Sequence, residues 1–211
     1  MRLTLSSSGG ECYSAGMTAE QPSSFRQPLK LKVDDYLLLA QAGSLDQYER
    51  TELIDGTIIV VSPLHRPHAR AVSLLLRRIA DQLERLAPGI EALPDASVDM
   101  PPRSMPRPDI VLTDEPIGEG FVPVGSVKLL VEVSDSTLAD DLGAKARLYA
   151  EQRIPEYWVV DLPGGELHQF WDPSESGFAQ RRVTALGETI EAATMAGLSV
   201  ETGGISDPQL D

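Results

Sequence analysis

The 211-residue chain has a single cysteine, Cys12, and no apolar run near the roughly 20 residues that cross a bilayer. A lone cysteine excludes a disulfide within the chain. The N-terminal stretch MRLTLSSSGGECYSAG also lacks the continuous apolar core of a secretory signal. We therefore expect no membrane segment and a cytoplasmic protein.

Basic residues are scarce, with 18 Lys and Arg against 32 Asp and Glu and a net charge of -14. Nucleic-acid binding relies on Lys and Arg to neutralise phosphates, so this balance argues against a nucleic-acid partner. The charge is uneven, however, because residues 161–211 hold nine acids and only two arginines. Between His65 and Arg85 five arginines oppose two acids. A local basic face is compatible with that segment.

The length and the 42% apolar content fit one globular domain with a sizeable core. Residues 1–28 are rich in Ser, Gly, Gln and Pro without periodicity, which is typical of a disordered tail. We expect an ordered domain over residues 29–200 and a flexible C-terminal tail over residues 201–211.

Helix and hairpin signals dominate the first part of the domain. The run from Val33 has an early acidic pair and ends at Gly43, as a short helix does. Asp55-Gly56 separates two β-rich runs and predicts a tight hairpin. Apolar residues at helical spacing then predict an amphipathic helix from about His68 to Leu86.

Strand candidates follow, first IEAL, ASVDM, DIVLTD and VKLLVEVS and later EYWVVD and ELHQFW, with a helix at 138–152 between the two groups. This order predicts an α/β fold, in which helices flank a mixed sheet and the hairpin is an N-terminal addition. The step from VKLLVEVS through the helix to EYWVVD predicts a right-handed parallel crossover.

Glu132 is a carboxylate inside an apolar strand. Alternation places Lys128, Leu130, Glu132 and Ser134 on one face, with Val127, Leu129, Val131 and Val133 on the other. Burying a carboxylate is costly unless a metal or a cation compensates it. The alternative is a solvated face on an edge strand.

Asp109 opens the strand DIVLTD directly after Pro108. If this strand runs antiparallel to VKLLVEVS, its start lies beside the end of the other, and Asp109 approaches Glu132. Pro-Asp before a strand is also an ordinary turn pair, so the importance of Asp109 depends on that partnership.

Lys145 lies in the following helix, four residues after Asp141. Such a pair is common on exposed helix surfaces and contributes about 0.3–0.5 kcal/mol. Spacing alone does not decide between a surface pair and a site residue.

The segments ELIDG, SPLHRPH, RPDIVLTD, LLVEVSDST, DLGAKARLYAEQRIPEYWVVD and AGLSV, spread in this order over about residues 30–200, resemble a family of restriction endonuclease-like proteins. That family belongs to the PD-(D/E)XK nuclease superfamily. The resemblance implies a restriction endonuclease-like core with Asp109 and Glu132 as metal ligands. Ser134 stands where the superfamily usually has a lysine, and the match to DLGAK implies that Lys145 replaces it.

The same resemblance points to further residues. Glu52 matches a family acid and is expected to be an outer metal ligand, or else only an acid at a strand start. His68 matches the histidine before the long helix, where it contacts phosphate or, as we prefer, caps the helix. We expect His68, Arg66 and Arg70 to contact nucleic acid. Aromatic residues at such positions are usually core, and we expect this of three: Tyr149, Tyr157 and Trp158.

This set of groups would suit the hydrolysis of a phosphodiester bond. Mg²⁺ or Mn²⁺ fits the carboxylates of Asp109 and Glu132 with the carbonyl of Val133, and Lys145 would orient the attacking water. The resemblance and these groups together predict a metal-dependent endonuclease acting on DNA. The resemblance and the apolar, strand-rich C-terminal half also predict a homodimer. Two alternatives remain, a catalytically silent dimeric binding module and a hydrolase of small phosphate esters.

Overall fold

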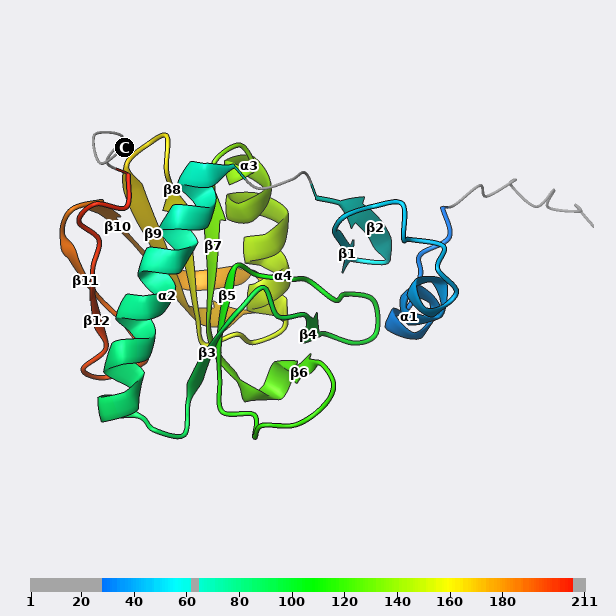
Figure 1. Cartoon of the computed structure of the whole chain (residues 1–211), viewed down its shortest axis with the longest axis horizontal. Coiled ribbons are helices and arrows are strands. Elements are labelled where there is room, and N and C mark those ends of the chain that lie inside the picture. Colours follow the sequence, from blue (N-terminus) through cyan, green and yellow to red (C-terminus); the bar gives the residue numbers. More distant parts are fainter. Residues whose placement is uncertain (1–27, 62–64, 207–211) are drawn as a thin grey trace, which may run out of the picture.

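The computed structural model of the chain describes residues 28–61 and 65–206. One main sheet lies between helical layers, and a hairpin with a short helix lies to one side of it (Figure 1). The expected N-terminal tail falls, up to residue 27, outside the described residues. In the described ranges no helix combines the length and apolarity needed to span a bilayer.

Helices and strands follow one another as α1 Val33–Gln41, β1 Thr51–Ile54, β2 Thr57–Val60, α2 Arg66–Leu86, β3 Glu91–Pro94, β4 Val98–Asp99, β5 Ile110–Thr113, β6 Val122–Pro123, the 3-10 turn η1 Val124–Ser126, β7 Val127–Ser134, α3 Leu138–Asp140, the π-helical turn η2 Asp141–Lys145, α4 Ala146–Glu151, β8 Glu156–Asp161, β9 Glu166–Ser174, β10 Gly177–Ala185, β11 Thr189–Glu191 and β12 Ser199–Glu201. The predicted first helix, hairpin and amphipathic helix are all present.

The main sheet has six strands in the order β10-β9-β8-β7-β5-β3. Strands β7 and β8 pair in parallel, and the other neighbours pair antiparallel. The mixed sheet expected from the sequence is therefore confirmed, as is the parallel step through the helical segment. Strand β7 is central, which explains its almost continuous apolar sequence.

Each face of the sheet is covered by a helix. On one face α2 packs Leu75 and Ile79 against strand residues such as Trp158, together with residues of β11 and β12. On the other face Tyr149 of α4 packs against Tyr157 and its strand neighbours. The 3.6-residue period of α2 and the alternation along the strands produce these two apolar layers.

The hairpin β1–β2 forms a smaller unit with α1. Leu53 packs with Val33 and Tyr36 of α1 and with Met105. Leu53 and Met105 also exchange backbone hydrogen bonds of 3.2 and 2.7 Å. The hairpin is thereby attached to the segment that leads into β5, and its residue Glu52 is brought near the start of that strand.

The structure corrects three of the predictions. A register shift between Leu112 and Thr113 interrupts the pairing of β5 with β7, so Val127 packs in the α4-side cluster and not with Leu129 as strict alternation predicts. The helix expected at 138–152 is divided into α3, η2 and α4. Glu201, assigned to a flexible tail, lies in β12, and the packed chain continues to the buried Ile205.

Candidate active site

Strand pairing brings the two predicted carboxylates together. Ile110 of β5 pairs with Val131 of β7, so Asp109 lies beside Glu132 where the two antiparallel strands separate. Both residues are buried, and Glu132 is only 3% exposed. The interpretation of Glu132 as part of a solvated edge strand is therefore wrong.

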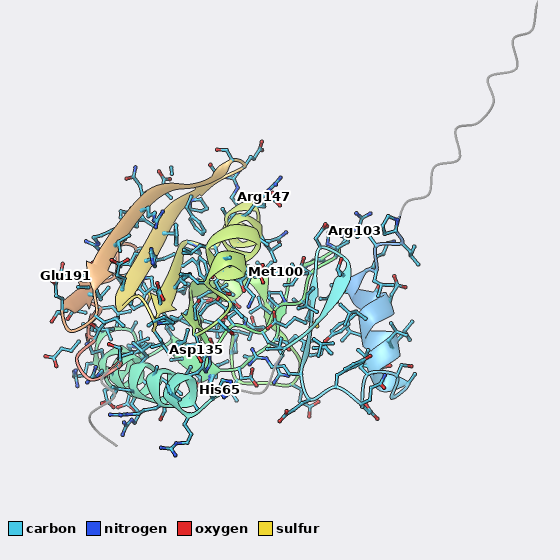
Figure 2. All side chains as sticks on the ribbon, turned by 90° about the horizontal axis from the view of Figure 1, so that it is seen from above. His65, Met100, Arg103, Asp135, Arg147 and Glu191 are labelled. Atoms are coloured by element: carbon cyan, nitrogen blue, oxygen red, sulfur yellow. The ribbon has the colours of Figure 1, made fainter. Side chains whose placement is uncertain are left out.

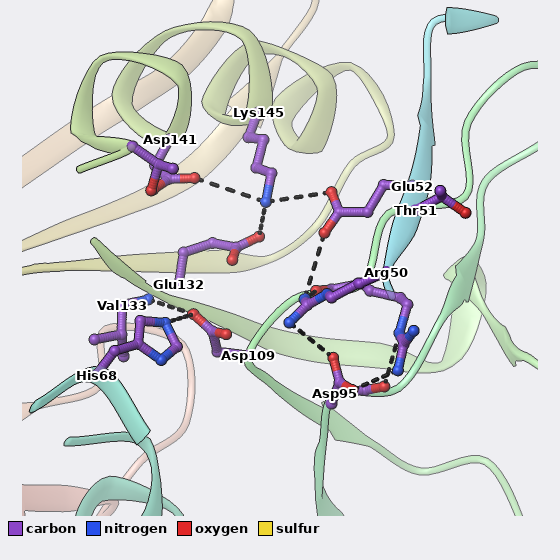
Figure 3. A network of polar contacts seen from close by, with 12 residues as sticks. Arg50, Thr51, Glu52, His68, Asp95, Asp109, Glu132, Val133, Asp141 and Lys145 are labelled. Atoms are coloured by element: carbon purple, nitrogen blue, oxygen red, sulfur yellow. Dashed lines mark hydrogen bonds and ion pairs between the residues drawn. The ribbon is translucent and has the colours of Figure 1, made fainter. Parts of the chain in front are cut away.

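Asp109 is held in place by two donors (Figure 3). Its Oδ2 accepts a hydrogen bond of 2.8 Å from the backbone N–H of Val133 and lies 3.1 Å from Nε2 of His68. In a strand the N–H and C=O of one residue point to the same side, so the carbonyl of Val133 faces this edge as well. The helix begins at Arg66 with His65 as its N-cap, which makes the capping role of His68 wrong.

Lys145 lies among three carboxylates (Figure 3). Its Nζ is 2.9 Å from Oε1 of Glu132, 3.4 Å from Oε2 of Glu52 and 3.7 Å from Oδ1 of Asp141. The Lys145 side chain is 17% exposed, so its pair with Asp141 is not an exposed surface pair. Turn η2 carries both residues, and π-helical turns inside helices often occur at functional sites.

The surroundings raise the pKa values of both Glu132 and Lys145, which favours the neutral form of the glutamate and the charged form of the lysine. Burial raises the pKa of Glu132 to about 8, with Lys145 opposing this and Asp109 adding to it. Burial lowers the pKa of Lys145, but the carboxylates of Glu132, Glu52 and Asp141 outweigh it and raise the pKa above its usual value. Glu132 thus binds a proton readily, while Lys145 stays cationic.

Tyr149 belongs to the core, as predicted, but it also contacts the site. Its hydroxyl donates a 2.9 Å hydrogen bond to Oε1 of Glu132. Burial raises the pKa of Tyr149, so the hydroxyl remains a neutral donor. In the sequence, the signal for this contact is that Tyr149 follows Lys145 by one helical turn, which places both side chains on the same side of a helix.

Asp141 was not predicted as a site residue. Its Oδ2 accepts hydrogen bonds from Ser134 Oγ at 2.5 Å and Thr137 Oγ1 at 2.7 Å. The same carboxylate contacts Lys145 through Oδ1. Asp141 therefore connects the end of β7 to the lysine.

Arg50 was also missed. Its Nη2 is 3.4 Å from Oε1 of Glu52, and its Nη1 is 3.0 Å from Oδ1 of Asp95. It donates a further hydrogen bond to the carbonyl of Arg107, two residues before Asp109. Arg50 thus connects the hairpin acid to the start of β5, and its position two residues before Glu52 was the only sequence signal.

These groups surround a cavity of about 350 Å³. Six carboxylates and two permanent cations line it, together with aliphatic side chains of the hairpin. His65 and Asp135 border the cavity from the start of α2 and from the loop after β7, and Figure 2 shows them close together in the view from above. Arg66 and Arg70 are exposed near the start of α2 and do not line the cavity.

The donor set at the strand ends fits a hard divalent cation. Asp109 and Glu132 offer carboxylate oxygens, and the carbonyl of Val133 faces the same edge. Within the described residues no group of three or more His, Cys, Asp or Glu side chains is arranged to hold a metal ion. Two carboxylates and one carbonyl suit Mg²⁺, which keeps several of its waters and takes few protein ligands.

Residues 33–203 match the family Uma2, which is described as "Putative restriction endonuclease". No curated protein matches the chain. A crystal structure of a "putative nuclease belonging to DUF820" from Anabaena variabilis superposes with a TM-score of 0.63. The two sequences are 14% identical, and the match covers 83% of this chain and 97% of the other. This likeness confirms the expected nuclease-like fold.

Proposed function

From the membership of this chain in the Uma2 family of restriction endonuclease-like proteins, we propose that it is a metal-dependent endonuclease that hydrolyses phosphodiester bonds, with DNA as the expected substrate. One observation carries the proposal. Asp109 and Glu132 meet at the ends of paired strands, and the ammonium of Lys145 lies 2.9 Å from Glu132.

The roles follow from the contacts. Asp109, Glu132 and the carbonyl of Val133 would hold Mg²⁺ or Mn²⁺. The bound ion supplies Lewis acidity and a water of lowered pKa. Lys145 stays protonated among the carboxylates, so it orients the attacking water and balances charge rather than acting as a base. Glu52 contacts the same ammonium and would be an outer ligand.

Other residues position these groups or bind the substrate. The hydrogen bond from Tyr149 fixes one oxygen of Glu132, and His68 fixes Asp109 while lining the cavity, where it can also contact a phosphate. Arg66 and Arg70 would contact backbone phosphates outside the cavity.

Hydrolysis of a small phosphate ester is a second candidate. The net charge of -14 repels a long polyanion but tolerates a small substrate that arrives with a metal ion. A dimeric binding module without turnover is a third candidate, and retention of both carboxylates and the lysine argues against it.

Cleavage assays distinguish the three candidates. Purified protein would be incubated with supercoiled plasmid, single-stranded DNA, RNA and a chromogenic phosphodiester, with Mn²⁺, Mg²⁺ or EDTA. We expect metal-dependent cleavage of nucleic acid that Asp109→Asn abolishes. Asp114→Asn is the matched control, because Asp114 pairs with Lys128 outside the cavity. Cleavage of the small ester alone favours the second candidate, and binding without cleavage favours the third.

A further inference from the structure

The hairpin has two faces with different neighbours. Leu53 and Ile58 point toward α1 and pack in its cluster. Glu52 pairs across the hairpin with Ile59, so these two side chains share the opposite face. That face borders the cavity, since both residues line it. The hairpin therefore presents an aliphatic side chain directly beside a site carboxylate.

Four aliphatic residues of the hairpin segment line the cavity, and three of them form what we call the aliphatic wall: Ile54, Ile59 and Val61; the fourth is Val60. Alternation along the strands places all three on the face of Glu52. Ile59 is 43% exposed and the adjacent Val60 is 52% exposed, whereas Leu53 on the other face of the hairpin is fully buried. A phosphate group makes no apolar contact with such a surface. The aliphatic wall therefore points to a ligand that has an apolar part as well as a phosphate.

We propose that the cavity takes one unpaired nucleotide, with its base against the aliphatic wall and its phosphate toward Lys145. This inference rests on the proposed nuclease function and specifies its substrate as single-stranded or locally unpaired nucleic acid. In a duplex each base is stacked between its neighbours, so a pocket that contacts a base face receives it only from an unpaired position.

The dimensions and the charge distribution agree with this occupant. A volume of about 350 Å³ lies near the lower end of the range of about 300–1,000 Å³ typical of small-molecule sites. The polar wall, with its lysine and its metal-binding carboxylates, matches a phosphodiester, and the aliphatic wall matches the face of a base. A nucleotide has both kinds of surface within one small ligand.

Binding of short oligonucleotides tests the inference separately from cleavage. Fluorescence anisotropy would be measured with labelled hexathymidylate, a fully abasic hexamer and a duplex, with Ca²⁺ in place of Mn²⁺ to suppress hydrolysis. We expect tightest binding to hexathymidylate. Ile59→Ser should weaken that binding roughly fivefold, because it removes the aliphatic contact, and leave the abasic hexamer unaffected. Ile59→Phe should retain or strengthen it by stacking.

The matched control is Ile117→Ser, the same exchange at a 90% exposed isoleucine between β5 and β6 that does not line the cavity. The inference is wrong if the duplex binds as tightly as hexathymidylate, or if hexathymidylate does not bind at all. It is also wrong if Ile59→Ser weakens binding of the abasic hexamer as much as binding of hexathymidylate. It is also wrong if Ile59→Ser changes only the oligomeric state, which would make the wall a protein contact. Selective binding without cleavage under any metal would leave the nucleotide pocket standing and overturn the nuclease function.

Discussion

Glu132 shows the sharpest conflict between a side chain and its surroundings. The carboxylate is buried in the central strand, and two donors, Lys145 Nζ and Tyr149 Oη, bind the same oxygen, Oε1. Burial still dominates, which raises the pKa of Glu132 to about 8. A metal ion would compensate the buried charge, so the metal-free protein should be strained when Glu132 is ionised.

The stability of the metal-free protein should therefore fall with rising pH. The pKa of Glu132 is higher in the folded state, at about 8, than its ordinary value of 4.5. The folded state thus binds the proton more tightly, and the stabilisation present below 4.5 is lost as pH rises to about 8. The slope is at most about 1.4 kcal/mol per pH unit. Melting curves in EDTA across this window should show the fall in the parent, and Glu132→Gln should remove it.

Metal binding should depend on the same carboxylate. Millimolar Mn²⁺ should raise the melting temperature of the parent by binding the native state, in proportion to RT ln(1 + [L]/Kd). Glu132→Gln should lose most of that gain, whereas Glu151→Gln, at an exposed carboxylate paired with Arg147, should keep it. A full Mn²⁺-induced shift in Glu132→Gln would refute the proposed metal site.

Lys145→Met tests the role of the ammonium. The substitution keeps the apolar stem and removes the charge, so we expect cleavage to fall by about 10² or more, as when one preorganised electrostatic donor of an active site is lost. The Mn²⁺-induced rise in melting temperature should persist, because Lys145 is not a proposed ligand. Lys128→Met, which breaks only the pair with Asp114, is the control. Activity equal to the parent would show that Lys145 has no part in the reaction.

Among the elements, those with a strong local period could be predicted. The apolar period of α2 and the Asp55-Gly56 turn both appear in the structure. Strands β5 and β7 pair in the antiparallel sense on which the expected approach of Asp109 to Glu132 depended. The π-helical turn could not be predicted, because its residues have ordinary helix propensities. Strands β10–β12 were missed, since their polar residues lack clear alternation.

Site residues divide in the same way. Glu132 followed from strand geometry, and Asp109 followed only on the condition that its strand runs antiparallel to that of Glu132. Lys145 followed only from the family resemblance. Arg50 and Asp141 gave no local signal, because their roles depend on partners brought close by folding: Arg50 contacts Asp95, and Asp141 contacts Ser134. Sequence reasoning finds a buried charge in an apolar strand but not the distant groups that surround it.

The hairpin turn offers a test of how an element positions the site. Gly56 has a φ of +69°, and a Cβ there would lie 2.8 Å from the carbonyl oxygen of Leu31. Gly56→Ala should lower the free energy of unfolding by about 1–2 kcal/mol from the left-handed backbone alone, with the clash adding to it. The turn joins the two strands that carry Glu52 and Ile59, so a displaced turn should move both residues in the cavity and lower the cleavage rate as well. Denaturant unfolding and the plasmid assay measure both.

Gly89→Ala is the control for this substitution, because a Cβ at Gly89 would meet no atom within 4 Å and its φ is not positive. Equal stability of the two variants would mean that the tight approach of Gly56 to Leu31 does not constrain the hairpin.

Across the whole molecule, the largest excess of acidic residues lies in residues 161–211, none of which line the cavity. Six carboxylates line the cavity, while the start of α2 carries Arg66 and Arg70 beside it. A nucleic-acid strand that approaches along α2 would meet positive charge first and reach the carboxylates only with a metal ion present. This distribution reconciles the net charge of -14 with the proposed substrate.

The sheet itself leads to the prediction of a homodimer. Strand β10 ends the six-stranded order and, among the described strands, pairs only with β9. Unpaired edge strands are templates for pairing unless charges block them. Arg181 and Arg182 do not block this edge, because their guanidinium groups lie over the rings of Phe170 and Trp171. Val183, 43% exposed, remains on the strand.

Two copies of β10 can pair antiparallel about a twofold axis and continue the sheet, because such an interface uses the same surface on both partners. Sedimentation velocity at micromolar concentration should therefore give about twice the 22.9 kDa of one chain. Val183→Lys should shift the protein toward monomer, since each interface would bury two ammonium groups near its axis. Ile117→Lys adds the same charge at an exposed loop and should leave the dimer intact. A parent that sediments as a monomer at every micromolar concentration would exclude the dimer, and a dimer that survives Val183→Lys would place the interface elsewhere than β10.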